Sequence, residues 1–132
     1  FVVNSFYYCD PDGKTNYVSC KDALPVDERT PSIKNLKFKN IVCNNCHVAA
    51  AYFYGLPEKK IESITMENIK VSYAKDAKIG KAAMMIGCEP SVKRGLFARN
   101  INHLSLKNVS IEGSDGTVFD IDGVDDFLVD EK

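Results

Sequence analysis

The stretch LKFKNIVC at residues 36–43 occurs in related form at two later positions, as ITMENIKV at residues 64–71 and as LSLKNVSI at residues 104–111. Apolar and polar residues alternate up to the asparagine of each copy, as they do in a β-strand with one buried face. A branched apolar residue directly follows the asparagine, so the buried side moves by one position there. Since an asparagine side chain tolerates unusual backbone dihedral angles, we expect each copy to be two strands joined by a bend.

A second, mostly apolar block that ends in glycine follows each copy: VAAAYFYG at residues 48–55, AAMMIG at residues 82–87 and TVFDIDG at residues 117–123. Two blocks that recur in the same order are typical of a protein built from stacked repeats, in which one repeat does not bury its apolar face alone. The pattern therefore favours an all-β chain of stacked coils, a β-solenoid.

The asparagines of the three copies, Asn40, Asn68 and Asn108, are separated by 28 and then by 40 residues. Like residues of stacked coils lie about 4.8 Å apart, which lets asparagine side chains hydrogen-bond along a column. We expect these three residues to form such a ladder, with a loop in the longer second repeat. The alternative is three turn asparagines on unrelated strands.

Length and composition suit a single domain that spans residues 1–132, with 45% hydrophobic residues. The 17 Lys and Arg residues balance 18 Asp and Glu residues, so no basic excess indicates binding to nucleic acid or to an anionic membrane. The longest apolar runs, of about eight residues, are short of the roughly 20 that cross a bilayer. Five cysteines, an odd number, favour free thiols and a reducing compartment such as the cytoplasm.

The chain begins with FVV at residues 1–3, which reads as the middle of a strand, and we expect it to be a C-terminal fragment of a longer protein. Residues 15–31 are polar and contain two prolines, which indicates a long loop outside the stack. Residues 96–101 read as an added strand. The charged tail, residues 124–132, reads as a last strand at the rim, where charge discourages pairing with another chain.

Three further strings are NSFYYCDPDGK at residues 4–14, YFYGLPE at residues 52–58 and AAMMIGCEP at residues 82–90. Together with the repeats, they resemble the C-terminal region of bacterial family 28 glycoside hydrolases, the polygalacturonase-like enzymes, over nearly the whole chain. The resemblance implies a right-handed parallel β-helix of about three to four coils. It also implies a parent enzyme that hydrolyses the galacturonan of pectin and inverts the anomeric carbon.

Inverting hydrolysis needs two carboxyl groups about 6.5–9.5 Å apart. The family supplies them from an Asn-Thr-Asp motif and an Asp-Asp pair, and it adds Gly-His-Gly and Arg-Ile-Lys motifs. The sequence has no Asn-Thr-Asp and no Gly-His-Gly, and residues 32–34 (SIK) lack the arginine. The pair of Asp125 and Asp126 lies after the repeats rather than before them. We therefore expect no catalytic residue in this chain and no hydrolysis by it alone.

Two tyrosines are candidates for substrate binding. The family has an active-site tyrosine at the end of an apolar strand, and Tyr7 matches that position. Tyr54 belongs to an alternating segment, one face of which could stack on a sugar ring; packing under a loop is the alternative. A basic stripe could meet galacturonate carboxylates or could simply be a solvated face; it consists of Lys34, Lys37 and Lys39.

The string CNNCH at residues 43–47 matches the attachment motif of a c-type haem, with His47 as an axial ligand. It straddles two repeat blocks, so a bend between strands is the simpler interpretation. His103 and the other cysteines lack the close spacing of a zinc site, and Asp10 with Asp12 reads as a turn rather than a calcium site. We therefore expect no metal and no cofactor, and surface positions for both histidines.

The expected partners are the preceding part of the same protein and, in the full protein, pectin. Because the N-terminal coil is open, we also expect a homo-oligomer through that end. The rival hypothesis is a stand-alone β-solenoid module that binds an acidic glycan through Tyr52, Tyr54 and the basic stripe.

Overall fold

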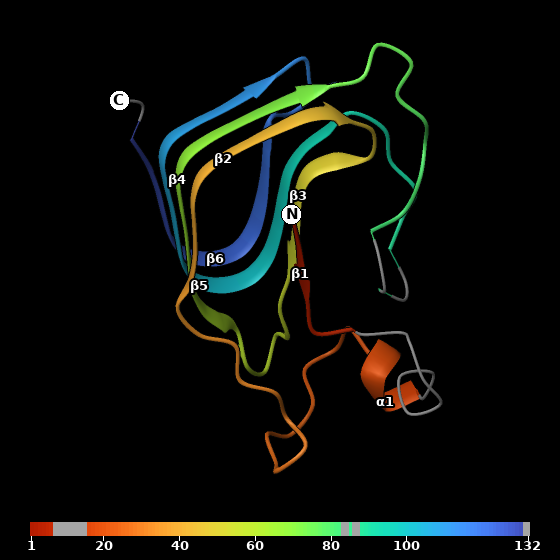
Figure 1. Cartoon of the computed structure of the whole chain (residues 1–132). Coiled ribbons are helices and arrows are strands. Elements are labelled where there is room, and N and C mark those ends of the chain that lie inside the picture. Colours follow the sequence, from red (N-terminus) through yellow and green to blue (C-terminus); the bar gives the residue numbers. More distant parts are fainter. Residues whose placement is uncertain (7–15, 83–84, 86–87, 131–132) are drawn as a thin grey trace.

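The computed structural model describes residues 1–6, 16–82, 85 and 88–130. The elements are β1 (Val2–Asn4), α1 (Asn16–Ser19), β2 (Leu36–Cys46), β3 (Ala49–Tyr54), β4 (Ile61–Tyr73), β5 (Arg94–Glu112) and β6 (Phe119–Asp130). The chain is all-β, as the alternating patterns predict, and α1 is the only helix in these described ranges. All pairings between the named strands are parallel (Figure 1).

The strands form one curled sheet, in which β5 bends and changes partners. The order is β1–β3–β5–β4–β2, and β6 pairs with β5 as well. Residues 94–99 of β5 pair with β3, residues 101–112 pair with β4, and Asn100 separates the two parts. Because β6 pairs with both parts of β5, it follows the same bend. The curl brings segments far apart in the sequence side by side around a common interior (Figure 1).

One column of bends is made by asparagines in the left-handed backbone region. Asn40, Asn68 and Asn108 have φ angles of 58°, 54° and 52°. Nδ2 of Asn68 donates a hydrogen bond to Oδ1 of Asn40 at 2.9 Å, and Nδ2 of Asn108 donates to Oδ1 of Asn68 at 2.8 Å. Apolar side chains on both sides of each bend reach the core, because the buried side moves by one position at the asparagine. The structure thus contains a ladder of these three side chains.

A second column of bends lies between β3 and β4 and within β5 and β6. Asn100 and Gly123 have φ angles of 59° and 67°, and Nδ2 of Asn100 donates a hydrogen bond to the carbonyl of Gly55 at 3.0 Å. A Cβ atom on Gly55 would lie 2.3 Å from the carbonyl oxygen of Asn100. The chain therefore needs glycine at position 55, where two backbones approach each other closely.

The prediction for the second apolar block is wrong. Residues 82–87 were expected to repeat the block at residues 48–55, but β3 pairs with residues 94–99, which overlap the segment that reads as an added strand. Of residues 82–87, the structure describes Ala82 and Met85, and both contact an apolar cluster outside the curl. Ala82 and Met85 are apolar because they pack on this outer cluster, and sequence alone does not distinguish such residues from those of an interior strand.

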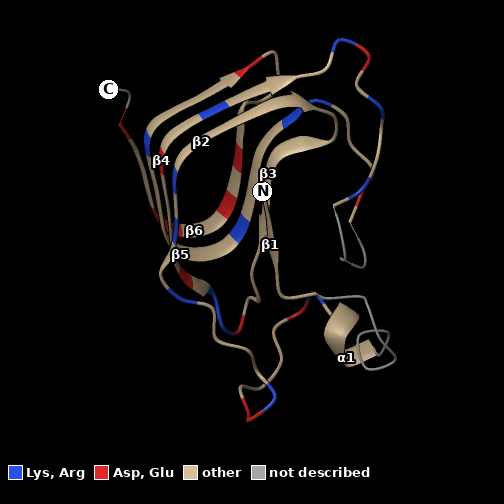
Figure 2. Ribbon diagram, viewed as in Figure 1, with Lys and Arg blue, Asp and Glu red and all other residues tan. Residues whose placement is uncertain are grey.

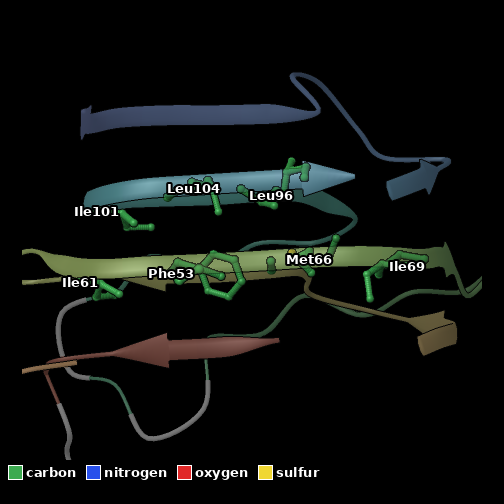
Figure 3. Close-up of a cluster of buried hydrophobic side chains, with 13 residues drawn as sticks. Phe53, Ile61, Met66, Ile69, Leu96, Ile101 and Leu104 are labelled. Carbon is green, nitrogen blue, oxygen red and sulfur yellow. The ribbon is translucent and has the colours of Figure 1, made fainter. Parts of the chain in front are cut away.

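Two apolar clusters lie on opposite sides of the sheet. The inner cluster, inside the curl, includes Phe53, Ile61, Met66, Ile69, Leu96, Ile101 and Leu104 (Figure 3). The outer cluster consists of Phe6, Tyr52, Leu56, Met85, Cys88 and Phe97. The outer cluster forms the floor of the candidate site described below. No helix in the described part of the chain is long and apolar enough to cross a membrane.

The loop and the tail have the forms that the sequence predicts. Residues 20–35 contain no strand (Figure 1). Ile33 in this segment packs against the inner core, and its carbonyl accepts a hydrogen bond from the N–H of Glu62 at 2.9 Å. The tail forms most of β6, which carries several aspartates along its length (Figure 2). β6 pairs only with β5 among the described strands, so the charged strand is an edge of the sheet.

Candidate binding site on the outer face of β3 and β5

Two rows of outward side chains cross three strands in register: Tyr52, Phe97 and Asp120 in one row, and Tyr54, Arg99 and Asp122 in the next. Alternation along β3 explains why both tyrosines face outward, since Phe53 between them lies in the inner core. Strand pairing therefore places aromatic and charged side chains next to one another on the outer face.

Phe97 is the centre of this group. Its ring stacks on the ring of Tyr52, with the centroids 4.3 Å apart and the planes at 13°. The Cζ atoms of Arg94 and Arg99 lie 4.5 Å and 4.1 Å from the centroid of the Phe97 ring. Because the π-system of an aromatic ring attracts cations, Phe97 helps to hold two guanidinium groups close together.

Asp120 links these two arginines. Its Oδ2 accepts a hydrogen bond from Nη2 of Arg94 at 2.8 Å, and its Oδ1 accepts one from Nη2 of Arg99 at 2.9 Å. Nη1 of Arg99 also donates to the carbonyls of Ala98 and Asp120, which fixes the plane of that guanidinium. The hydrogen bond from Arg94, with a further one from Arg99, holds the pKa of Asp120 below its ordinary value.

A cavity of about 240 Å³ opens beside this network; it is lined by Tyr52, Tyr54, Glu89, Arg94, Phe97 and Arg99. The side chains of Arg94 and Arg99 are 24% and 23% exposed, so solvent and ligands reach both guanidinium groups. Guanidinium groups suit planar carboxylates, and the tyrosine rings offer apolar surface with a polar edge. The cavity is thus suited to a sugar that carries a carboxylate.

Lys21 lies near the rings of Phe6 and Tyr54. Its Nζ lies 3.9 Å from the centroid of the Phe6 ring and 5.8 Å from that of Tyr54. Burial lowers the pKa of Lys21. The loop that carries Lys21 thus adds a third cation to the aromatic group.

Replacing Asp120 by asparagine is expected to remove a pH-dependent contribution to stability. The pKa of Asp120 is lower in the folded state than its ordinary value of 3.8, so the carboxylate stabilises the fold fully above that value. This contribution is lost as the pH falls through the lower, folded-state pKa. Urea denaturation should therefore show a difference in the free energy of unfolding that is constant near neutral pH and shrinks below about pH 4.

Asp122→Asn is the matched control for this experiment, because Asp122 lies in the next row of the same strand, and no ion pair joins it to another described residue. The same pH-dependent difference in the control variant would contradict the role assigned to the two arginines.

The residues predicted for substrate binding have different surroundings. Tyr7 lies outside the described residues. Tyr54 lines the cavity and is half-buried, whereas Tyr52 is only 5% exposed because the outer cluster covers it. For Tyr52, packing under a loop is therefore the better description, and Tyr54 is the tyrosine that a ligand would reach.

The basic stripe does not join the tyrosines. Lys37 and Lys39 lie on β2, which pairs with β4, whereas both tyrosines lie on β3, which pairs with β5 on the other side of the bend at Asn100. Ion pairs join Lys34 to Glu62 at 3.9 Å and Lys39 to Glu67 at 3.4 Å. The stripe and the tyrosines therefore belong to different surfaces.

The residues of the haem-like string lie at a bend. Cys43 and Cys46 are free thiols that pack against the inner core, and burial together with the Cys43 thiol raises the pKa of Cys46. His47 is exposed, and its Nδ1 accepts a hydrogen bond from the backbone N–H of Lys78 at 3.0 Å. Because a haem attached to both thiols would displace core side chains, the bend interpretation fits this geometry better.

The other candidate ligands are scattered. His103 is exposed, and its Nδ1 lies 2.7 Å from Oδ2 of Asp126. Asp10 and Asp12 lie outside the described residues. Within the ranges that the structure describes, no group of three His, Cys, Asp or Glu side chains is arranged to hold a metal ion.

A larger cavity, of about 360 Å³, lies near the bend between β3 and β4. Two of its lysines are paired, since Lys60 lies 2.8 Å from Asp125 and Lys34 lies 3.9 Å from Glu62. No aromatic ring lines it. It therefore lacks the flat aromatic surface on which a sugar ring would stack.

Arg94, Arg99 and Asp120 were missed by the sequence analysis, because they belong to no recognised motif. Residues 94–99 lie in register with residues 49–54. Had the sequence analysis matched these two segments, it would have placed Arg99 beside Tyr54. The apolar run at residues 82–87 concealed that alignment.

Comparison of the chain with models of protein families, with curated proteins and with solved structures finds no match in any of the three. Function is therefore inferred from the geometry of the outer face and from the resemblance of the sequence motifs.

Proposed function

We propose that this chain is the C-terminal part of a pectin-degrading glycoside hydrolase of the polygalacturonase-like kind. In the full protein it supports the catalytic coils and contributes a binding surface for galacturonan. The surface is the cavity beside Tyr54, Arg94 and Arg99. The chain alone hydrolyses nothing, because the sequence lacks the Asn-Thr-Asp and Gly-His-Gly motifs of that family.

The proposal includes a fold: the curled sheet is about three to four coils of a right-handed parallel β-helix. Parallel pairing supports it, as does the register in which Leu36, Ile64, Leu104 and Phe127 lie on four neighbouring strands. The two columns of bends support it as well, because bends that recur in register are typical of stacked coils.

The observation that carries the proposed binding function is the pair of arginines on Phe97 at the mouth of a polar cavity. Each guanidinium has five N–H donors, and the hydrogen bonds described above leave several of them for a ligand. A galacturonate carboxylate can accept two parallel hydrogen bonds from such a group. The half-buried ring of Tyr54 then lies where the sugar ring would stack.

Replacing Arg99 by alanine is expected to weaken binding of polygalacturonate by about 10- to 100-fold, since a hydrogen bond to a charged group contributes roughly 1.5–3 kcal/mol. Isothermal titration calorimetry with defined oligogalacturonates measures the loss. Arg99→Lys should recover only part of the affinity, because lysine keeps the charge but not the planar fork. Fully methyl-esterified pectin, which lacks the carboxylates, should bind weakly to every variant.

Lys107→Ala is the matched control, because Lys107 is an exposed cation on the same strand beyond the bend at Asn100. If both variants, Arg99→Ala and Lys107→Ala, lost the same affinity, binding would depend only on the net charge of the chain, and the proposed site would be wrong. Release of reducing ends by the chain alone would contradict the expected absence of hydrolysis.

A stand-alone binding module is the second candidate, and the absence of the catalytic motifs from the sequence favours it. Such a module would use Tyr54 with Arg99 rather than with the basic stripe, which lies on another surface. The coding sequence before Phe1 distinguishes the two candidates, because only the hydrolase requires the Asp-Asp, Gly-His-Gly and Arg-Ile-Lys motifs there.

A further inference from the structure

Three strands, β1, β2 and β6, each have a single strand partner among the described residues, so each leaves one edge open. β2 pairs only with β4, and β6 pairs only with β5. The free N–H and C=O groups of such an edge are a template for one more strand. The edges of β2 and β6 are the long ones, since β2 has 11 residues and β6 has 12, whereas β1 has 3.

Apolar columns reach both edges, and their last side chains are less buried than those in the middle. Phe38, Met66, Leu106 and Val129 lie in register on four neighbouring strands. The two middle residues of this column are 2% and 1% exposed, whereas Val129 at one end is 43% exposed and Phe38 at the other end is half-buried. One more strand on either edge would bury the last side chain as the inner ones are buried.

The neighbouring column of outward side chains alternates in charge. Lys39, Glu67, Lys107 and Asp130 lie in register on β2, β4, β5 and β6, and Nζ of Lys39 lies 3.4 Å from Oε2 of Glu67. The β2 edge therefore ends in a cation and the β6 edge in an anion. Figure 2 shows the acidic positions along β6.

We propose that a second copy of this chain docks on the first head to tail, with its β2 parallel to β6 and its Lys39 beside Asp130. The charges select this arrangement, because two β2 edges would bring lysines together and two β6 edges would bring aspartates together. The contact uses a different surface on each copy, so further copies add in an open row.

The inference concerns the 132-residue chain and rests on the proposed coil arrangement. In a longer protein of the proposed kind, a preceding coil would occupy the β2 edge instead. The two copies meet at the ends of the stack, whereas Arg94 and Arg99 lie on the outer face of β5.

Sedimentation velocity over a range of concentrations tests the head-to-tail contact. The wild-type chain should form species larger than a dimer as its concentration rises. Asp130→Lys makes both edges basic and Lys39→Asp makes both edges acidic, so each variant alone should assemble at least about tenfold more weakly. An equal mixture of the two variants should assemble as the wild type does, because every contact in it joins opposite charges.

Asp76→Lys is the control, because Asp76 is exposed in the loop after β4 and belongs to neither edge strand, and the substitution changes the net charge as Asp130→Lys does. Circular dichroism of each variant checks that it is folded, and the mixture provides a second check, since an unfolded variant would not restore assembly. A monomer at all concentrations overturns the inference. The inference is also overturned if the Asp130→Lys variant assembles at the same concentrations as the wild type. Glycan binding measured at concentrations where the chain is monomeric tests the proposed function separately.

Discussion

Replacing Phe53 by alanine is expected to lower the free energy of unfolding by about 3–5 kcal/mol. Phe53 is completely buried in the inner cluster, and its ring is parallel to that of Phe38 with the centroids 6.4 Å apart. Truncation leaves a cavity that the neighbouring strands close only in part, because their backbone hydrogen bonds fix their spacing. Urea denaturation should show a lower midpoint and an unchanged slope.

Two variants serve as controls for Phe53→Ala. Phe53→Leu keeps most of the apolar volume and should cost clearly less than the alanine variant. Tyr54→Ala changes the next residue of the same strand, which is half-buried on the outer face, and should also cost less. A loss for Phe53→Ala of no more than about 0.5 kcal/mol, which is usual for surface residues, would contradict the placement of this ring in a packed interior.

Replacing Asn68 by alanine is expected to cost about 2–3 kcal/mol, a large effect for a residue on the surface. Asn68 is the middle residue of the ladder, so its amide both donates to Asn40 and accepts from Asn108. Its φ angle of 54° adds a second cost, because alanine is strained in the left-handed region. The loss is measured as the shift in the midpoint of urea denaturation.

Asn68→Gly separates the two contributions. Glycine also lacks the amide but adopts positive φ without strain, so this variant should be more stable than Asn68→Ala by about 1 kcal/mol. Asn102→Ala is a further control, because Asn102 lies outside both columns of bends and its φ angle is not positive. If the alanine and glycine variants at position 68 were equally stable, the left-handed backbone would contribute nothing, and the account of the bend would be wrong.

The sequence was informative where the relevant physics is local. The alternation in residues 36–43 and the branched residue after Asn40 are sufficient to predict two strands, a bend and a change of the buried side. The recurrence of the same asparagine in two later copies predicts a column, since parallel stacking places like residues beside one another. Alternation also made Tyr54 a candidate for binding, with packing under a loop as the alternative, and the structure places Phe53 beside it in the inner core.

The sequence failed where two segments had to be matched across a long gap. β3 and the first part of β5 are separated by β4 and by residues 74–93. The sequence of that loop does not indicate which later segment pairs with β3. In the sequence, the apolar residues of the loop have the same pattern as a strand of the core, because an outer cluster and an inner cluster both require apolar side chains. The arginines of the candidate site belong to the segment that was therefore misassigned.

The sequence by itself determined the bends at Asn40, Asn68 and Asn108 and the change of the buried side there, because alternation and left-handed asparagines are properties of neighbouring residues. Only the tertiary structure decided that Arg94, Arg99 and Asp120 meet at Phe97 beside Tyr54. That meeting depends on the register of strands that are distant in the chain, and a shift of one residue would turn every one of these side chains to the other face.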